Sequence, residues 1–369
     1  MCCCCPPAIT ALFCLWFQSG FSKGTVAGAL TFFPPEPPLY KFERVDEEGK
    51  LLEEDETEEK KEEEKTNDQI KDGNYRPKEG ETHEEMKSPA QQMTEKAKEL
   101  RKRAKLRKAQ DKKDEENNVK YKLVLDRRLS PPRFKGASVE AVKIPTKTGA
   151  YCAAIVYRCP AEKVDDNTKT IIYSHGNATD IGAMFPLQAI IANSLKCNVV
   201  SYDYSGYGES GGTPMEKNTY TDIAGVLKWT VKNICDDDES KVILYGQSVG
   251  SGPCCYMGCR VDGLGGMVLH SPFMSGMRVL TPSRALACLD IFPNIDRIRK
   301  VKCPVFVIHG ARDEEVHLGH GQALHEAVPN HLKRDPWWVP NRGHNDITDG
   351  PGMLPEYLRR LRQFIESLD

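Results

Sequence analysis

The residues best suited to chemistry form the pattern Gly-x-Ser-x-Gly, which runs from Gly246 to Gly250 with Ser248 at its centre. The β-branched apolar run Val242–Tyr245 comes before it, and residues compatible with a helix follow. A strand, a glycine-flanked serine and a helix make a nucleophile elbow, a strained turn that lifts the serine hydroxyl above a sheet. A Cβ at either glycine would clash with the neighbouring strand or helix, which explains why both positions are glycine. The pattern also occurs by chance, so the prediction requires a base, an acid and oxyanion donors elsewhere.

A carboxylate and a histidine follow the serine in the order that acyl transfer requires. The serine needs a base to take its proton and a carboxylate to orient that base. Asp313 stands at the turn after the apolar run 304–309, and His344 follows the last predicted strand. We therefore predict catalytic roles for Ser248, Asp313 and His344, since the other histidines come before Asp313 or do not follow a strand. Three nearby carboxylates remain alternative acids: Glu314, Glu315 and Asp346.

Two backbone N–H groups are also needed to hold the negative charge that develops on the substrate oxygen. Val249, the residue after the serine, is predicted to supply one of them. Asn177, in the loop that follows the predicted strand Thr170–Ser174, is predicted to supply the other. Gly176 allows the backbone of this loop to approach closely. The alternative is that residues 175–177 form only a turn.

The elements around these residues alternate between short apolar runs and amphipathic stretches. The first strands are separated by turns and the later ones by helices, which predicts an α/β-hydrolase fold with a mostly parallel eight-stranded sheet and flanking helices. The eight predicted strands are Ser138–Ile144, Tyr151–Tyr157, Thr170–Ser174, Asn198–Tyr202, Val242–Tyr245, Gly266–His270, Pro304–His309 and Trp337–Pro340. The predicted helices are Met184–Leu195, Thr219–Ile234, Ser248–Arg260, Gly321–Ala327 and Pro355–Leu368.

Composition divides the chain of 369 residues into three parts. Hydrophobic residues make up 39% of the chain, yet the mean hydropathy is −0.52, so an ordinary globular part is diluted by a very polar one. We predict a Cys-rich acylated anchor with a Pro-rich spacer over residues 1–45, a charged low-complexity linker that is partly helical over 46–118, and a catalytic domain over 119–369. A net charge of −2 argues against a nucleic-acid partner.

The first residues predict attachment to a membrane surface. The apolar stretch Ala8–Phe17 is too short to span a bilayer. Several acyl chains beside an interfacial apolar segment hold a protein stably at a membrane. The alternatives are a signal peptide cleaved near Ala27–Ala29 and a redox-inert or metal-binding cysteine tract. The predicted S-acylation sites are Cys2, Cys3, Cys4 and Cys5.

The second part of the charged segment, Lys96–Lys113, is basic and has a helix-forming composition. One interpretation of the segment is a tethered, solvated linker. The other is that the stretch Lys96–Lys108 rests on anionic lipid headgroups.

Six spaced motifs, in order, are similar to the alpha/beta-hydrolase-domain-17-type proteins. The resemblance covers about two thirds of the chain, from about Val139 to the C-terminus. The N-terminal cysteines followed by Phe-Pro-Pro-Glu-Pro also resemble the anchor of that family. The motifs lie at residues 173–178, 201–208, 245–250, 270–278, 292–296 and 343–346.

The resemblance implies a membrane-tethered serine thioesterase that removes S-palmitoyl groups from cysteines of other proteins. It places the nucleophile, acid and base on Ser248, Asp313 and His344. It also implies a peripheral membrane protein on the cytosolic face of the plasma membrane and endosomes. We expect a monomer with no cofactor and no metal, and S-palmitoylated proteins as substrates.

Two departures from the family leave substrate choice open: a longer charged segment over 45–118 and a different loop over 330–336. The triad alone does not separate thioesters from esters, so a lipid or small-ester carboxylesterase is an alternative. A catalytically idle membrane scaffold is the alternative from another class.

Overall fold

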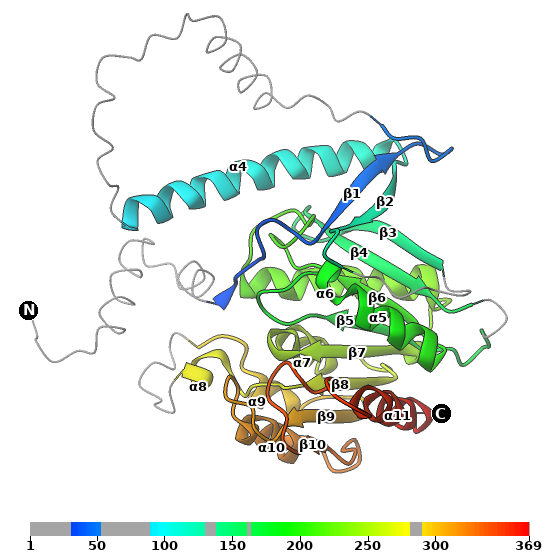
Figure 1. Cartoon of the computed structure of the whole chain (residues 1–369), viewed down its shortest axis with the longest axis vertical. Coiled ribbons are helices and arrows are strands. Elements are labelled where there is room, and N and C mark those ends of the chain that lie inside the picture. The colour runs from blue at the N-terminus through cyan, green and yellow to red at the C-terminus, as the bar shows by residue number, and fades with distance from the viewer. Residues whose placement is uncertain (1–30, 53–88, 130–137, 161–163, 281–289, 369) are drawn as a thin grey trace, which may run out of the picture.

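The computed structural model describes residues 31–52, 89–129, 138–160, 164–280 and 290–368 (Figure 1). The predicted acylation sites at residues 2–5 lie outside these ranges. None of the helices in the described ranges combines the length and the apolar character that a bilayer span requires.

The described part of the chain is built on one ten-stranded sheet with the order β1-β2-β3-β4-β6-β5-β7-β8-β9-β10. Neighbouring strands are antiparallel from β1 through β4 to β6, and all later pairs are parallel. This mostly parallel sheet agrees with the predicted architecture. The strands are β1 (Tyr40–Val45), β2 (Lys120–Leu125), β3 (Ser138–Pro145), β4 (Tyr151–Arg158), β5 (Thr170–Ser174), β6 (Asn198–Tyr202), β7 (Val242–Gln247), β8 (Gly266–His270), β9 (Val305–Gly310) and β10 (Trp337–Val339).

The predicted count of eight strands was wrong, because β1 and β2 extend the antiparallel end of the sheet. Both come from segments that were assigned outside the sheet, β1 from the spacer and β2 from the start of the catalytic part. In β1, Tyr40 and Phe42 are buried and Lys41 is exposed, which is the alternation of a strand with one covered face. β1 pairs with β2 along its full length, whereas β2 and β3 share one pair, Tyr121 with Ala141. Part of the predicted anchor-and-spacer region therefore packs with the domain.

The helix α4 (Pro89–Glu116) lies within the charged segment. Its last turns dock on the antiparallel end of the sheet (Figure 1). The buried Asp111 pairs with Lys143 of β3, and Asp114 pairs with Arg44 of β1 at 2.8 Å. A cavity of about 650 Å³ lies beside these contacts, between α4 and the strands β2 and β3. None of the predicted catalytic residues lines it.

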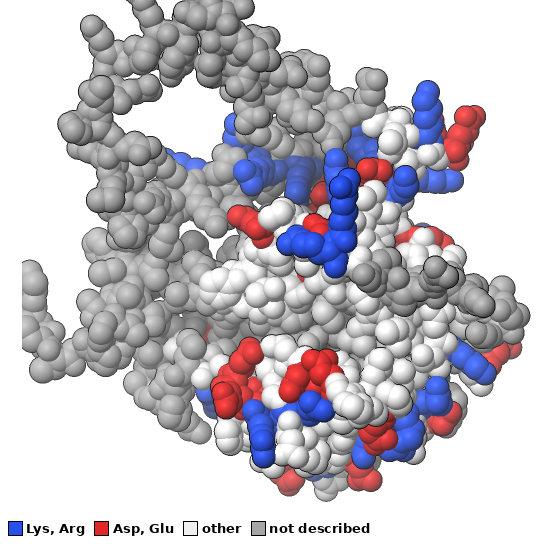
Figure 2. Space-filling view, in the orientation of Figure 1, with Lys and Arg blue, Asp and Glu red and all other residues white. Residues whose placement is uncertain are grey.

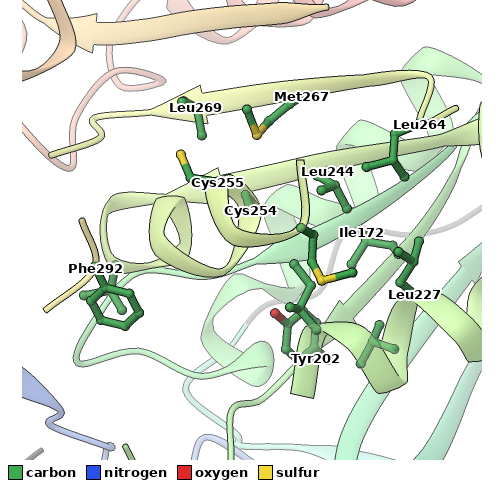
Figure 3. Close-up of a cluster of buried hydrophobic side chains, with 14 of the residues drawn as sticks. Ile172, Tyr202, Leu227, Leu244, Cys254, Cys255, Leu264, Met267, Leu269 and Phe292 are labelled. Carbon is green, nitrogen blue, oxygen red and sulfur yellow. The ribbon is translucent and has the colours of Figure 1, made fainter. Parts of the chain in front are cut away.

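Helices cover both faces of the sheet and bury two hydrophobic clusters. The helices α6 (Glu216–Ile234) and α7 (Ser251–Gly258) pack on one face, and Figure 3 shows Leu227, Leu244 and Cys254 in the hydrophobic cluster there. On the other face lie α5 (Ile181–Leu195) and α11 (Met353–Glu366). The remaining helical segments are η2 (Glu239–Lys241), η3 (Ser248–Gly250), α8 (Gly276–Leu280), α9 (Asn294–Ile298) and α10 (Leu318–Ala327).

The described cysteines are free, and all of them but Cys259 are buried. Burial raises the pKa of Cys254 and of Cys303 to about 12, so both remain protonated thiols at neutral pH.

Candidate active site

The predicted elbow lies where β7 ends and the helical segment η3–α7 begins (Figure 1). Ser248 has a φ of 50°, the left-handed conformation that L-residues rarely adopt. A Cβ on Gly246 would come within 2.9 Å of the Cys254 sulfur, and a Cβ on Gly250 would overlap the Ser174 carbonyl. The strain at the serine and the need for both glycines are therefore features of the structure.

The structure brings the three predicted catalytic residues into one hydrogen-bonded chain. The Ser248 Oγ lies 3.0 Å from the His344 Nε2. The His344 Nδ1 lies 2.7 Å from the Asp313 Oδ2. Asp313 and His344 are buried and Ser248 is partly exposed, so the chain leads from the interior to a surface that a substrate can reach.

Adjacent parallel strands bring the acid and the base together. Asp313 follows β9 and His344 follows β10, and the carboxyl ends of neighbouring parallel strands lie at the same edge of a sheet. The Arg312 N–H donates to the Arg342 carbonyl at 2.8 Å, which ties the two loops to each other. A Cβ on Gly310 would overlap the carbonyls of this second loop, so a glycine is needed for their close approach.

Several donors hold Asp313 as a carboxylate. Its Oδ1 accepts the N–H groups of Glu315 and Val316, at 3.0 and 2.7 Å. Its Oδ2 lies 3.2 Å from the His309 Nε2, in addition to the contact with His344. Burial raises the pKa of Asp313, but the hydrogen bonds from His309, His344 and Val316 outweigh this, and the pKa lies below its ordinary value.

The alternative acids bind other groups. Glu315 accepts a hydrogen bond from the Asn345 side chain at 2.9 Å. The Asp346 Oδ1 accepts the Gly343 N–H at 2.6 Å and so braces the loop that carries the histidine. Glu314 is exposed to solvent. Asp313 is therefore the carboxylate positioned to orient His344.

The two predicted oxyanion donors flank the serine. Val249 lies in the first turn of η3, where backbone N–H groups have no partner within the helix. Gly176 is so close to the serine that a Cβ on it would lie 3.9 Å from the Ser248 Cβ. Asn177 follows Gly176, and Ala178 then adopts a left-handed φ of 53°. The loop thus passes directly beside the nucleophile, as a second oxyanion donor requires.

His270 ends β8 near the triad but belongs to a separate buried network. Its Nδ1 lies 2.8 Å from the Tyr245 hydroxyl, which also contacts the Tyr357 hydroxyl at 2.7 Å. Burial, with nearby His344 and His309, lowers the pKa of His270 to about 3. A pKa this low makes His270 a weak base, in agreement with its exclusion as the group that takes the serine proton.

Two groups at the site were missed by sequence reasoning. His309 was set aside because it comes before Asp313, yet its ring lies against that carboxylate. A histidine at a strand end with an aspartate four residues later was the available signal. The hydroxyl of Tyr207 contacts the Asn177 side chain at 2.8 Å, and no local spacing indicates that contact.

Comparison with known proteins identifies the family. Residues 165–295 match the family model described as serine aminopeptidase, S33. Over 230 residues the chain is 40% identical to alpha/beta hydrolase domain-containing protein 17C of Xenopus laevis, a match that covers 62% of this chain and 70% of that protein. The chain belongs to the alpha/beta hydrolase domain-containing protein 17 family.

Two further proteins are similar to this chain. Alpha/beta hydrolase domain-containing protein aho-3 of Caenorhabditis elegans is 45% identical over 198 residues, which are 53% of this chain and 57% of that relative. The match to this relative therefore spans less than two thirds of its length. An esterase of Pyrococcus furiosus superposes on 65% of this chain and 99% of its own with a TM-score of 0.51. Its sequence identity of 19% shows the shared fold alone.

Membership of the domain-containing protein 17 family confirms the predicted α/β-hydrolase fold. The family and the matched S33 model together support an α/β serine hydrolase. Within the described residues, no cluster of three His, Cys, Asp or Glu side chains is arranged to hold a metal ion.

Proposed function

We propose that this protein is a serine hydrolase that cleaves S-palmitoyl thioesters from cysteines of membrane-associated proteins. The hydrogen-bonded chain from Ser248 through His344 to Asp313 carries the catalytic part of this proposal. Membership of the alpha/beta hydrolase domain-containing protein 17 family and the N-terminal cysteines support the choice of substrate.

In the first half of the reaction, the His344 Nε2 takes the hydroxyl proton as the Ser248 oxygen attacks the thioester carbonyl carbon. The N–H groups of Val249 and Asn177 hold the negative charge on the carbonyl oxygen. The carbon–sulfur bond then breaks, and the cysteine thiolate leaves and takes the proton from His344. An acyl-serine remains on the enzyme.

In the second half, His344 removes a proton from water as the water oxygen attacks the acyl-serine. The ester bond breaks, the proton passes to the Ser248 oxygen, and palmitate is released. Asp313 stabilises the imidazolium in both halves without itself becoming protonated. The depressed pKa of Asp313 fits this role.

The direct test is Ser248→Ala, assayed by fluorophosphonate labelling and by turnover of a palmitoyl-cysteine peptide. Labelling should disappear and turnover should fall on the order of 10⁴- to 10⁶-fold, because the nucleophile is lost. Ser240→Ala, which changes an exposed serine at the opposite end of β7, should leave both readouts unchanged. Labelling that persists in Ser248→Ala would refute the nucleophile. Wild-type protein without labelling would favour the scaffold interpretation.

The substrate class needs its own comparison, because the triad also fits esters. Turnover of a palmitoyl-cysteine peptide should exceed turnover of a monoacylglycerol with the same acyl chain. The reverse preference would favour the carboxylesterase alternative.

We further propose that acylation of residues 2–5 holds the protein on the cytosolic face of the plasma membrane and endosomes. Simultaneous replacement of these four cysteines by serine should move the protein to the soluble fraction and spare hydrolysis of a soluble ester. Unchanged membrane fractionation would contradict the proposal that these cysteines anchor the protein.

A further inference from the structure

A segment from the N-terminal part of the chain lies against the loop beside the nucleophile. We call residues Thr31–Tyr40 the strap. Phe32 is 5% exposed, and its ring packs edge-on against Tyr207 at 6.4 Å and Phe292 at 6.1 Å between centroids. Figure 3 shows Phe292 beside α7, the helix that follows the elbow. The start of the strap is therefore anchored in the core next to the candidate site.

The side chain of Asn177 clamps this start of the strap. Its Nδ2 donates to the Thr31 carbonyl at 2.6 Å. Its Oδ1 accepts from the Phe33 N–H at 3.1 Å and from the Tyr207 hydroxyl at 2.8 Å. The Phe33 N–H also lies 3.1 Å from that hydroxyl. Asn177, the predicted oxyanion residue, is thus held from two sides through its side chain.

The other end of the strap holds the end of the same loop. The Leu39 N–H donates to the Asp180 Oδ2 at 2.7 Å. The Asp180 Oδ1 accepts the Ala183 N–H at 2.8 Å and so caps α5. A Cβ on Gly182 would come within 2.9 Å of the Leu39 carbonyl, so the two backbones lie in close contact. The strap therefore spans the loop 177–180 and binds both of its ends.

This loop needs such support. Ala178 has a left-handed φ of 53°, a conformation that persists in a non-glycine residue only where surrounding contacts hold it. An N–H donor stabilises an oxyanion only when it is aimed in advance at the place where the charge develops. Loss of the contacts at Asn177 would let the loop relax and turn its N–H away from the substrate oxygen.

We propose that the strap is a positioning element for the oxyanion loop. Phe32 of the strap and Tyr207, which contacts both the strap and Asn177, are the positioning residues. This inference rests on the proposed serine-hydrolase function and adds the element that prepares its oxyanion site. Residues 1–30, which contain the predicted membrane anchor, lead directly into the strap. Attachment at the membrane and geometry at the nucleophile are thereby linked through one covalent segment.

The sharpest test is Tyr207→Phe, which removes one hydroxyl and keeps the ring against Phe32. With a soluble thioester, kcat should fall roughly 10- to 100-fold, less than the loss expected for a deleted donor, while KM changes less than about twofold. Affinity for an alkyl trifluoromethyl ketone should weaken by a similar factor. The serine adds to this ketone and creates an oxyanion, so its binding reports on the oxyanion site rather than on acyl-chain binding.

Phe32→Ala should show the same pattern, and Phe32→Leu should recover most of the lost rate because it refills the site between the two rings. Phe364→Ala is the matched control. This ring is 4% exposed and stacks on Phe306, on the α11 side of the sheet. Phe364→Ala should lower the melting temperature by about as much as Phe32→Ala does, yet leave kcat unchanged below that temperature.

Two results would overturn the inference. Tyr207→Phe could keep the wild-type kcat and ketone affinity, or Phe364→Ala could lose kcat as strongly as Phe32→Ala does. Either outcome would show that the strap stabilises the fold without positioning the oxyanion loop, while the enzyme remains active. Failure of the proposed function is distinct, because the wild-type protein itself would then show neither turnover nor fluorophosphonate labelling.

Discussion

Asp313 determines which nitrogen of His344 carries the proton. The carboxylate already accepts two backbone N–H groups and lies beside His309. It therefore stays ionised and requires a donor on the His344 Nδ1. The Nε2 is left to accept the Ser248 hydroxyl proton. The direction of proton transfer thus follows from how one carboxylate is bound.

Asp313→Asn should lower kcat on the order of 10⁴-fold, because an amide that donates to the Nδ1 leaves the wrong tautomer at the Nε2. Turnover of a soluble ester or thioester measures the loss. Glu314→Gln is the control, since this neighbouring carboxylate is exposed to solvent. Equal losses in both variants would contradict the assignment of the acid.

The same substitution should change how stability depends on pH. The folded-state pKa of Asp313 lies below the ordinary value of 3.8, so the carboxylate stabilises the folded state fully above that value. This contribution is lost as the pH falls through the lower folded-state pKa. The difference in Tm between wild type and Asp313→Asn should therefore be largest near pH 7 and shrink below about pH 4. A difference that grows on acidification would show that the pKa is raised instead.

At the scale of elements, the elbow depends on how closely α7 approaches the sheet. Gly250→Ala would push a methyl group into the Ser174 carbonyl at the end of β5. Because backbone must shift, the free energy of unfolding should fall by about 1–3 kcal/mol and the Ser248 hydroxyl should lose its alignment. Chemical denaturation and fluorophosphonate labelling rates measure the two effects.

Gly258→Ala is the control for this prediction. It lies in the last turn of α7, and a Cβ there would first meet the flexible Met267 side chain at 3.3 Å. The exchange of glycine for alanine in a helix is favourable by up to about 1 kcal/mol. This variant should keep full activity, and a loss equal to that of Gly250→Ala would show that α7 tolerates no alanine at all.

Buried strands were the elements that sequence reasoning predicted best. The ends of β5, β6 and β8 were predicted to the residue, since each is a short, fully buried run whose ends are marked by polar or glycine residues. The strands β1 and β2 were missed because only one face of each strand is covered and because each lies beside Pro-rich or charged sequence. Their pairing depends on each other, and no local pattern contains that information.

The candidate site, too, was predicted from the sequence only in part. The order of Ser248, Asp313 and His344 follows from chain order and strand ends, and the structure brings all three together. The loop of Asn177 was placed correctly beside the nucleophile. Its clamp by Thr31 was not foreseen, because that contact joins residues 146 positions apart.

At the scale of the whole molecule, α4 binds the domain through one face and presents lysines on the other. Arg107, Asp111 and Asp114 lie toward the sheet and bind its edge or the adjacent loop. The exposed lysines Lys98, Lys102 and Lys105 recur at intervals of four and three, and so share the opposite side of the helix. Figure 2 shows blue side chains along this helix, and in Figure 1 its first turns extend past the sheet on the side where α8 lies.

A helix whose two buried aspartates bind the domain and whose exposed lysines face outward suits an anionic membrane surface. Neutralising Lys98, Lys102 and Lys105 to glutamine should weaken binding to phosphatidylserine vesicles on the order of 100-fold, at about 1 kcal/mol for each lysine. Added salt should weaken wild-type binding in the same direction. The control replaces three exposed cations near α9, at the far end of the sheet: Arg299, Lys300 and Lys302. If both triple variants bind equally well, α4 is a solvated helix that makes no contribution to membrane binding.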